Sequence, residues 1–241
     1  MNESIVIITG SAPLAPAAVE AIPDEAILLA VDGGLDHALA AGLTPSGLIG
    51  DLDSVTEPGL VWAARNATID RHPADKDETD TELALAFAAA MTPERLILVG
   101  GGDRLDHTIA ALGALGAPVL TSVPSIEAWW GDQHLRVIHG PGTATLDLVP
   151  GSTLSLLALH GPCRAVSIAG VRWPLDDVEL KPVIGFGVSN EVADDGTVEV
   201  RLSEGVLTVF DRPALPQTPT TESDPATESR PATTEPTEAP S

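Results

Sequence analysis

The sequence predicts an α/β N-terminal domain with a mostly parallel sheet, followed by an all-β sandwich domain and a disordered C-terminal tail. In the first half of the chain, short β-branched runs alternate with alanine- and leucine-rich segments, as in βα units of a parallel sheet. Farther along, strand-like runs follow one another closely between Gly and Pro turn signals. The last segment consists almost wholly of Pro, Thr, Glu, Ser and Ala, which bury too little apolar surface to fold. The predicted boundaries are therefore 1–123, 124–212 and 213–241.

The first domain is expected to alternate strands with helices. Each strand run is rich in Ile, Leu and Val, and each helical run in Ala and Leu. The expected strands are 4–9, 26–31, 47–50, 67–71, 96–99 and 118–121, and the expected helices are 16–21, 35–41, 56–65, 80–90 and 105–115. Ser54 and Glu57 have the S-x-x-E spacing of a capping box, and Thr79 and Glu82 repeat it.

The second domain contains strand-like runs and no segment with the length and apolar period of a helix. The runs are 126–130, 134–139, 143–149, 153–159, 164–170, 197–202 and 205–210. Turn residues such as Gly140-Pro141-Gly142 and Pro150-Gly151 separate them. This spacing favours antiparallel strands in a sandwich or barrel.

Acidic residues dominate the charge of the chain. It has 35 Asp and Glu against 12 Lys and Arg, a net charge of -23. Such a chain repels nucleic acid backbones and anionic membranes, so neither is an expected partner. The N-terminal apolar run is too short for a signal peptide core or a membrane span. The chain has a single cysteine, Cys163, so it cannot form an intramolecular disulfide. We expect a soluble, cytoplasmic protein.

Acidic clusters follow four of the predicted strands. They are Asp32; Asp51 and Asp53; Asp75, Asp77 and Asp80; and Asp103 and Asp106. Because ligands of open parallel sheets bind beyond the carboxyl ends of the strands, these acids should gather at one edge. Crowded carboxylates repel one another, and protonation or a bound cation relieves the repulsion. The pattern predicts a site for phosphate and magnesium.

Two basic residues lie within these acidic segments. Lys76, one of only two lysines, could meet a phosphate while the neighbouring acids hold its metal. Arg104 follows the glycines 100–102 at a predicted helix start, where backbone amides favour an anion. Asp106 is a candidate metal ligand or proton acceptor, and His107 is expected to be a structural residue of the helix start.

Five motifs in this order resemble those of the thiamine pyrophosphokinase family, also called thiamine diphosphokinase. They are VDGG (31–34), GDLDS (50–54), KDETDTELAL (76–85), GGDRLDH (101–107) and GVSNE (187–191). The resemblance spans most of the chain and leaves only the tail uncovered. It implies transfer of pyrophosphate from ATP to the hydroxyl of thiamine, giving thiamine diphosphate and AMP. It also implies an N-terminal nucleotide domain, a C-terminal β-sandwich that contributes to the thiamine pocket, and a homodimer.

The resemblance further implies roles for individual residues. Asp51, Asp53 and Asp80 would hold Mg2+. The nucleotide would be bound by Asp32, Gly33, Lys76, Asp77 and Arg104, and thiamine by Ser189 and Asn190 at the dimer cleft. The catalytic set would be Asp53, Asp80, Arg104 and Asp106, with Asp106 or Asp53 accepting the proton of the thiamine hydroxyl.

A few positions depart from the family pattern. Where the family often has asparagine, phenylalanine, glycine and tyrosine, this chain has Asp36, Leu52, Asp103 and Trp173, in that order. None of these departures removes a predicted metal ligand. Trp129 and Trp130 are expected to be packing residues.

Two other functions agree with the same residues. The metal site could serve another Mg2+-dependent phosphotransferase or a phosphohydrolase acting on a different small molecule. The chain could also be a non-catalytic module that binds thiamine or a nucleotide. The GVSNE motif disfavours the first alternative, and the number of carboxylates disfavours the second.

Overall fold

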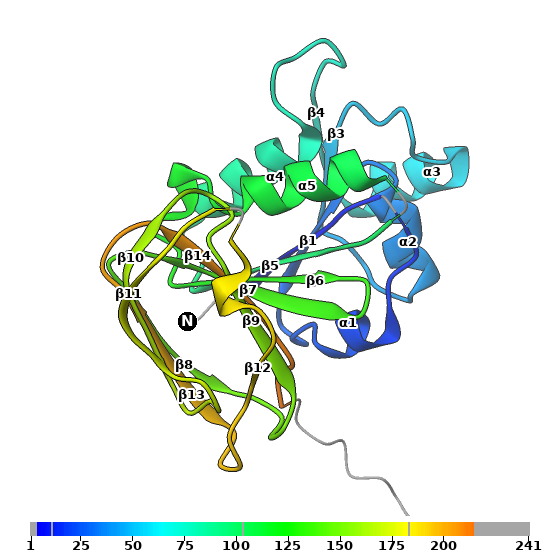
Figure 1. The fold of residues 1–241 in the computed structure, drawn as a ribbon. Helices are drawn as coiled ribbons and strands as arrows, with labels where there is room; N and C mark the ends of the chain where they lie inside the picture. Colours follow the sequence, from blue (N-terminus) through cyan, green and yellow to red (C-terminus); the bar gives the residue numbers. More distant parts are fainter. Residues whose placement is uncertain (1–3, 11, 103, 183, 215–241) are drawn as a thin grey trace, which may run out of the picture.

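One ten-stranded sheet runs through the molecule, and a four-stranded sheet faces its antiparallel end (Figure 1). The computed structural model describes residues 4–10, 12–102, 104–182 and 184–214. The strand orders are β12-β9-β14-β7-β6-β5-β1-β2-β3-β4 and β11-β10-β13-β8. The predicted fold class, an α/β part followed by an antiparallel β part, is confirmed. From residue 215 onward, the tail predicted to be disordered lies outside the described residues.

The N-terminal part alternates strands and helices as predicted. Its elements are β1 (Ser4–Ile8), α1 (Pro16–Glu20), β2 (Ile27–Val31), α2 (Gly34–Ala40), β3 (Gly47–Gly50), α3 (Glu57–Asn66), β4 (Thr68–Arg71), α4 (Asp80–Ala90), β5 (Arg95–Gly100), α5 (Leu105–Ala114), the 3-10 helix η1 (Pro118–Leu120) and β6 (Ser125–Trp130). The strand predicted at 118–121 is wrong. Pro118 sits at the first helical position, where its fixed φ suits a helix, and it has no N–H to donate to a sheet.

The C-terminal part is antiparallel. Its elements are β7 (Gln133–His139), β8 (Gly142–Asp147), β9 (Thr153–Leu157), β10 (Cys163–Ala169), β11 (Leu175–Leu180), the 3-10 helix η2 (Gly185–Gly187), β12 (Asn190–Glu191), β13 (Thr197–Leu202) and β14 (Val206–Asp211). β6 pairs parallel to β5 and antiparallel to β7, so the long sheet continues past residue 123. The division of the chain into domains at that point stays a prediction.

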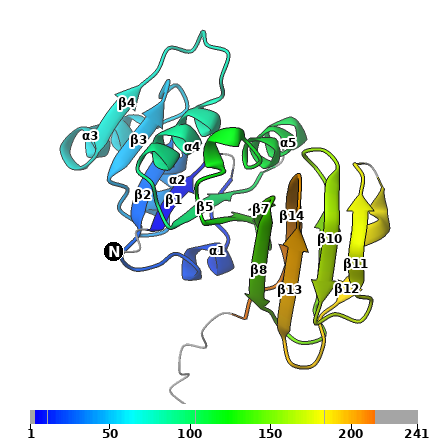
Figure 2. The same ribbon diagram turned by 90° about the vertical axis from the view of Figure 1, so that its left-hand side faces the viewer.

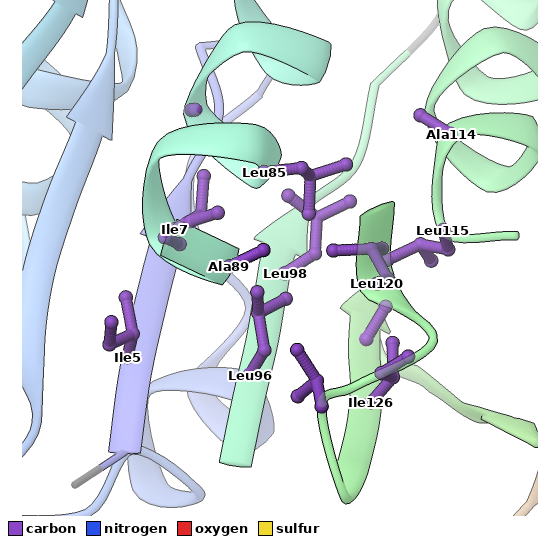
Figure 3. Packing of buried hydrophobic residues seen from close by; sticks show 14 of the residues in the cluster. Ile5, Ile7, Leu85, Ala89, Leu96, Leu98, Ala114, Leu115, Leu120 and Ile126 are labelled. Atoms are coloured by element: carbon purple, nitrogen blue, oxygen red, sulfur yellow. The ribbon is translucent and has the colours of Figure 1, made fainter. Parts of the chain in front are cut away.

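The parallel strands bury side chains on both faces. Ile5 and Ile7 of β1 belong to the core beneath α4 and α5, which Figure 3 shows with Leu85 and Leu98. Val6 and Ile8 alternate with them and pack on the opposite face with residues of α1 and α2. This burial on two sides explains why the strands read as continuous apolar runs.

A second core lies between the two sheets of the antiparallel part. Leu154 and Val209 of the long sheet pack in one cluster with Val166 and Val200 of the short sheet, and all four are fully buried. In the short sheet, β10 and β13 alternate buried residues with more exposed ones because the other face of that sheet meets solvent. Among the described residues, no helix is long and apolar enough to cross a membrane.

A network of charged side chains lies where the sheet changes from parallel to antiparallel. The carboxylate of Glu127 accepts hydrogen bonds from Arg95 (3.0 Å to Oε1) and contacts His134 Nε2 (3.3 Å). Asp211 pairs with His134 Nδ1 (2.6 Å) and with Arg136 Nε (2.9 Å). The side chains of Glu127 and Asp211 are 5% and 0% exposed. Hydrogen bonds to His134 and Arg95 overcome the effect of burial and hold the pKa of Glu127 well below its usual range.

Candidate active site

A pocket of about 590 Å³ opens at the carboxyl ends of the parallel strands. Four predicted acids line it, and we call Asp32, Asp51, Asp53 and Asp80 the rim aspartates. They come from the ends of β2 and β3 and from the start of α4. The rest of the lining is Thr9, Gly10, Val31, Ser54, Thr79, Thr81, Arg104, His107, Ala110, Ala111 and Trp130. The structure thus brings together acids that lie far apart in the sequence, as the parallel sheet predicts.

Asp32 is held in a constrained position at the end of β2. Its φ of 47° lies in the left-handed region, and its Oδ1 accepts a hydrogen bond from the Leu52 N–H (3.0 Å). A Cβ on Gly50 would clash with this carboxylate, so the glycine makes room for it. Burial raises the pKa of Asp32 to about 6, and the negative charges of Asp80, Asp51 and Asp53 add to the shift. The rim aspartates therefore act on one another electrostatically.

Asp51 and Asp53 are ordered by the turn that follows β3. Asp51 Oδ1 accepts a hydrogen bond from the Asp53 N–H (3.0 Å), and Leu52 between them has a φ of 69°. A left-handed residue other than glycine is costly, and such residues cluster at functional sites. The turn directs both aspartates to the pocket.

The capping box predicted at Ser54 and Glu57 is wrong. The N-cap of α3 is Thr56, whose hydroxyl accepts a hydrogen bond from the Gly59 N–H (3.2 Å). Thr56 is fixed from outside the helix by Asp36, which accepts hydrogen bonds from its backbone N–H (2.8 Å) and its hydroxyl (2.6 Å). Ser54 instead accepts a hydrogen bond from the Gly33 N–H (3.1 Å). The departure at Asp36 therefore joins α2 to α3.

Asp80 is the first residue of α4 and directly follows the N-cap Thr79. The capping box predicted for Thr79 and Glu82 is confirmed. Thr79 Oγ1 accepts a hydrogen bond from the Glu82 N–H (3.2 Å), and Glu82 Oε2 accepts one from the Thr79 N–H (2.8 Å). The box fixes where the helix begins and so sets the direction of Asp80. One oxygen of Asp80, Oδ1, is buried and has no hydrogen-bond partner among the described residues.

Lys76 and Asp77 do not line the pocket. The Lys76 ammonium lies 3.0 Å from Asp80 Oδ1 and donates a hydrogen bond to the Pro73 carbonyl (2.9 Å). Asp75 and Asp77 are exposed. Gly33 is also absent from the lining, although its N–H braces Ser54, which does line the pocket.

Arg104 lines the pocket, whereas Asp106, which is hydrogen-bonded to Arg104, does not. The guanidinium donates to both oxygens of Asp106, with a distance of 3.2 Å from Nε to Oδ1, and both side chains are exposed. This hydrogen-bonded pair with Arg104 lowers the pKa of Asp106 to about 2. Asp103 lies outside the described residues.

Two residues of the lining were expected to have only structural roles. His107 and Trp130 both face the pocket. The Trp130 indole N–H donates a hydrogen bond to Thr108 Oγ1 on α5 (3.1 Å), which fixes the ring. The position of Trp130 at the end of a parallel strand was the available signal, since that is where ligands bind.

Ser189 and Asn190 do not line this pocket. Asn190 begins β12, which pairs with β9 at the end of the long sheet farthest in strand order from β4 (Figure 2). Ser189 has a φ of 62°, and its N–H donates to Ser155 Oγ (3.1 Å). The Asn190 amide accepts a hydrogen bond from the Trp173 N–H (3.1 Å) and donates one to the Trp173 carbonyl (2.7 Å). The Trp173 ring is 53% exposed and stacks with Arg172, whose Cζ lies 4.7 Å from its centroid. Asn190 thus positions an exposed aromatic face that the sequence analysis did not assign to the site.

The donor chemistry of the rim aspartates fits magnesium. Carboxylate oxygens are the ligands that Mg2+ prefers, and Asp80 Oδ1 is a buried acceptor without a hydrogen bond. Within the described ranges, no three acidic, histidine or cysteine side chains are close enough to hold one metal ion. Magnesium at phosphate-transfer sites takes one or two carboxylates together with water and substrate phosphates. The arrangement therefore suits an ion whose remaining ligands are water or substrate phosphates.

Two family models match consecutive parts of the chain. The model described as thiamin pyrophosphokinase, catalytic domain, matches residues 19–124, and the model described as thiamin pyrophosphokinase, vitamin B1 binding domain, matches residues 143–207. The first match contains the rim aspartates and Arg104, and the second contains Trp173 and Asn190.

Individual proteins show the same similarity. Thiamine pyrophosphokinase from Bacillus subtilis (strain 168) is 25% identical over 172 residues, which are 70% of this chain and 79% of the relative. A crystal structure of the Bacillus subtilis thiamine pyrophosphokinase superposes with a TM-score of 0.75 at 23% identity, covering 88% of this chain and 100% of that one. The Geobacillus thermodenitrificans thiamin pyrophosphokinase gives 0.71 at 27% identity, covering 87% and 97%.

Proposed function

Because the chain belongs to the thiamin pyrophosphokinase family, we propose that it transfers pyrophosphate from ATP to the hydroxyl of thiamine, giving thiamine diphosphate and AMP. The observation that carries this proposal is the convergence of the rim aspartates and Arg104 on one pocket. Phosphoryl-type transfer asks the protein mainly for positioning and charge neutralisation, because the reaction needs no covalent protein intermediate. In the reaction the thiamine oxygen bonds to the β-phosphorus, and the bond from that phosphorus to the α-phosphate oxygen breaks.

We propose that Mg2+ binds beside the nucleotide among Asp51, Asp53 and Asp80, with one or two of these carboxylates and the substrate phosphates as its ligands. Magnesium, when bound, would neutralise negative charge on the phosphate oxygens. Arg104 would contact a phosphate with its planar fork, oriented by its two hydrogen bonds to Asp106. Asp32 would face the nucleotide from the end of β2. Gly33 would contribute to the same side of the site by donating a hydrogen bond from its N–H to Ser54 Oγ.

Of the two candidate proton acceptors, Asp53 and Asp106, we favour Asp53, which would take the proton on an oxygen that does not ligate Mg2+. Asp106 is engaged on both oxygens by Arg104, which lowers its pKa to about 2, and it lies outside the pocket lining. A carboxylate with such a pKa is a weak base for a hydroxyl proton. Lys76 and Asp77 would act from the segment that precedes α4, Lys76 on a phosphate and Asp77 near the metal.

We propose that thiamine binds at Trp173 and Asn190, with Ser189 beside them, in a homodimer. Within one chain these residues do not line the rim pocket, so a second copy would have to present them to it. The exposed apolar residues of this end, Leu159, Trp173, Ile184, Phe186 and Val188, favour burial against another surface. The flat indole face suits stacking with the cationic ring system of thiamine.

A cytoplasmic location agrees with a single, buried cysteine.

An assay of AMP release tests the activity. Purified protein is incubated with ATP and Mg2+, with and without thiamine, and the products are separated by chromatography. We expect AMP and thiamine diphosphate in equal amounts, and only when thiamine is present. ADP or inorganic phosphate in place of AMP would instead indicate a phosphotransferase or a phosphohydrolase, and binding without turnover would indicate a binding module.

Mixing two inactive variants tests the shared site. Asp53→Asn removes one half of the site and Trp173→Ala the other, so each variant alone should lack activity. After unfolding and refolding together, random pairing restores one intact site in half of the dimers, or about a quarter of the wild-type activity. An active monomer by light scattering, or no recovery in a mixture that forms dimers, would contradict the shared site.

A further inference from the structure

Lys76 occupies an unusual place for a residue expected to bind phosphate. Its ammonium does not reach the lining of the rim pocket but lies 3.0 Å from Oδ1 of Asp80, four residues ahead. The side chains of Lys76 and Asp80 are only 12% and 18% exposed, so this ion pair is largely shielded from water. A cation of the chain itself therefore sits on a predicted ligand of magnesium.

The ion pair leaves Asp80 Oδ1 able to accept a hydrogen bond or to bind a metal ion. Although Nζ is 3.0 Å away, this oxygen is buried and has no hydrogen-bond partner among the described residues. The ammonium donates a hydrogen bond to the carbonyl of Pro73 (2.9 Å). The ammonium thus supplies positive charge to Asp80 without well-aligned hydrogen bonding, and a better-placed cation could replace it.

The surroundings of Asp80 favour such a replacement. Asp32, Asp51 and Asp53 line the same pocket and add negative charge that one ammonium cannot balance. Lys76 lies before the N-cap Thr79, outside α4, so its movement does not require the helix to unwind. A divalent ion on Oδ1 would repel the ammonium at this short distance, and the phosphates that accompany the ion would attract it.

We propose that Lys76 is an exchangeable counter-cation, which neutralises Asp80 in the free protein and moves to the nucleotide phosphates when Mg2+ and ATP bind. This inference rests on the proposed function for the identity of the nucleotide, but its ion exchange does not depend on thiamine. Lys76 is then a positioning residue that keeps the rim aspartates in place before the substrate arrives.

The lysine content of the chain makes the exchange directly observable. Lys76 and Lys181 are the only lysines, so lysine labelled with 13C and 15N gives two sets of side-chain NMR signals. Lys181 is an internal control, because its ammonium is exposed and pairs with Glu179 (3.4 Å). The Lys181→Met variant assigns the signals. We expect the Lys76 side-chain signals to shift on titration with MgCl2 and again on addition of ATP, while those of Lys181 stay.

Binding measurements on Lys76→Met separate this role from a structural one. Without the competing ammonium, calorimetry should show Mg2+ alone binding about three to ten times more tightly, as expected on removing a nearby like charge. ATP in the presence of Mg2+ should bind about ten times more weakly, because a phosphate contact is lost. Lys181→Met should change neither affinity. A merely structural lysine would weaken both ligands together.

Three results would overturn the inference: Lys76 signals that do not move at saturating Mg2+, equal or weaker Mg2+ binding by Lys76→Met, and no detectable Mg2+ binding by the wild type. The NMR experiment uses the wild-type chain, so it decides the matter even where the variant does not fold. Failure of the proposed function would look different, because the lysine exchange would occur without AMP release.

Discussion

The molecule contains two groups of acidic side chains that are handled in opposite ways. Glu127 and Asp211 are buried in the middle of the long sheet, and Arg95, His134 and Arg136 neutralise them. The rim aspartates lie at the sheet edge, where Lys76 pairs with Asp80 and the carboxylates act on one another. The first group carries its counter-charges within the fold, whereas the second leaves part of its charge for a ligand. The difference teaches that acidic side chains fully neutralised by basic side chains serve the fold, whereas acidic side chains that are only partly neutralised are candidates for a functional role.

The largest expected effect is on stability at the buried group. Glu127→Gln removes the charge that three cationic side chains surround, and breaking a buried pair in this way costs about 3–5 kcal/mol of unfolding free energy. Urea denaturation followed by circular dichroism measures the loss. Glu204→Gln is the matched control, because its partner Arg164 (3.3 Å) and Glu204 itself are exposed, and it should change stability by less than about 0.5 kcal/mol. Equal effects of the two variants would break the comparison.

At the rim, the corresponding change should cost activity and leave the fold intact. Asp53→Asn is expected to slow AMP release about 10²–10³-fold, the range seen when one group that stabilises transition-state charge is removed. Stability should change by less than about 1 kcal/mol, because the substitution also relieves repulsion among the rim aspartates. A steady-state assay and a urea denaturation on the same preparation decide this. Loss of stability comparable to that of Glu127→Gln would show that the rim is structural.

Added cation should stabilise the rim and not the buried group. At a free Mg2+ concentration about 100 times the dissociation constant, a ligand that binds only the folded state contributes about 2.7 kcal/mol. Thermal unfolding with MgCl2 or EDTA measures this increment. Asp80→Asn should reduce it, and Glu127→Gln should retain it despite a lower starting stability. An increment that survives in Asp80→Asn would remove that residue from the metal site.

The smallest effect is the pH dependence of stability at the buried group. Burial alone would lower the pKa of His134, but hydrogen bonds with Asp211 and Glu127 outweigh it and raise the pKa above the ordinary 6.5. The charged histidine therefore contributes stability that is complete below pH 6.5 and is lost as the pH rises through the folded-state pKa. Glu127, whose pKa is lowered, contributes above pH 4.5 and loses its contribution as the pH falls.

Comparison of the wild type with His134→Gln, both in EDTA, isolates this effect. Unfolding free energies from pH 5 to pH 9 should converge as the pH rises, because the wild type loses the stabilisation that the variant lacks throughout. Curves that stay parallel over the whole range would show that folding leaves the pKa of His134 unshifted.

Local sequence patterns predicted most of the fold. The capping box at Thr79 and Glu82 depends on residues within one helical turn, and the structure has it. The box at Ser54 fails because Asp36, distant in sequence, fixes Thr56 as the N-cap instead. Strand β11 escaped prediction because its sequence, LDDVEL, is largely exposed and acidic, and its pairing with β10 supplies what the pattern lacks.

The candidate site was predictable to the extent that topology determines it. Acids at the ends of parallel strands must share an edge, and so the rim aspartates meet. The contact of Lys76 with Asp80 depends on how one segment folds back, which no spacing rule specifies. The separation of Asn190 from the rim depends on how the antiparallel part of the chain folds, and the position of Trp173 depends on hydrogen bonds of its backbone with the side chain of Asn190 in β12.

Strand β14 affects the order in which the protein can fold during synthesis. It is the last strand of the described chain, yet it lies between β7 and β9 inside the long sheet. It also supplies Asp211, the partner of His134 and Arg136. On the ribosome, β1 to β6 can pair early, whereas β7 and β9 must wait with open edges until residues 206–211 emerge. The nascent chain therefore passes through a stage in which β1 to β7 can already be paired, while β9 still lacks the strand that joins it to them.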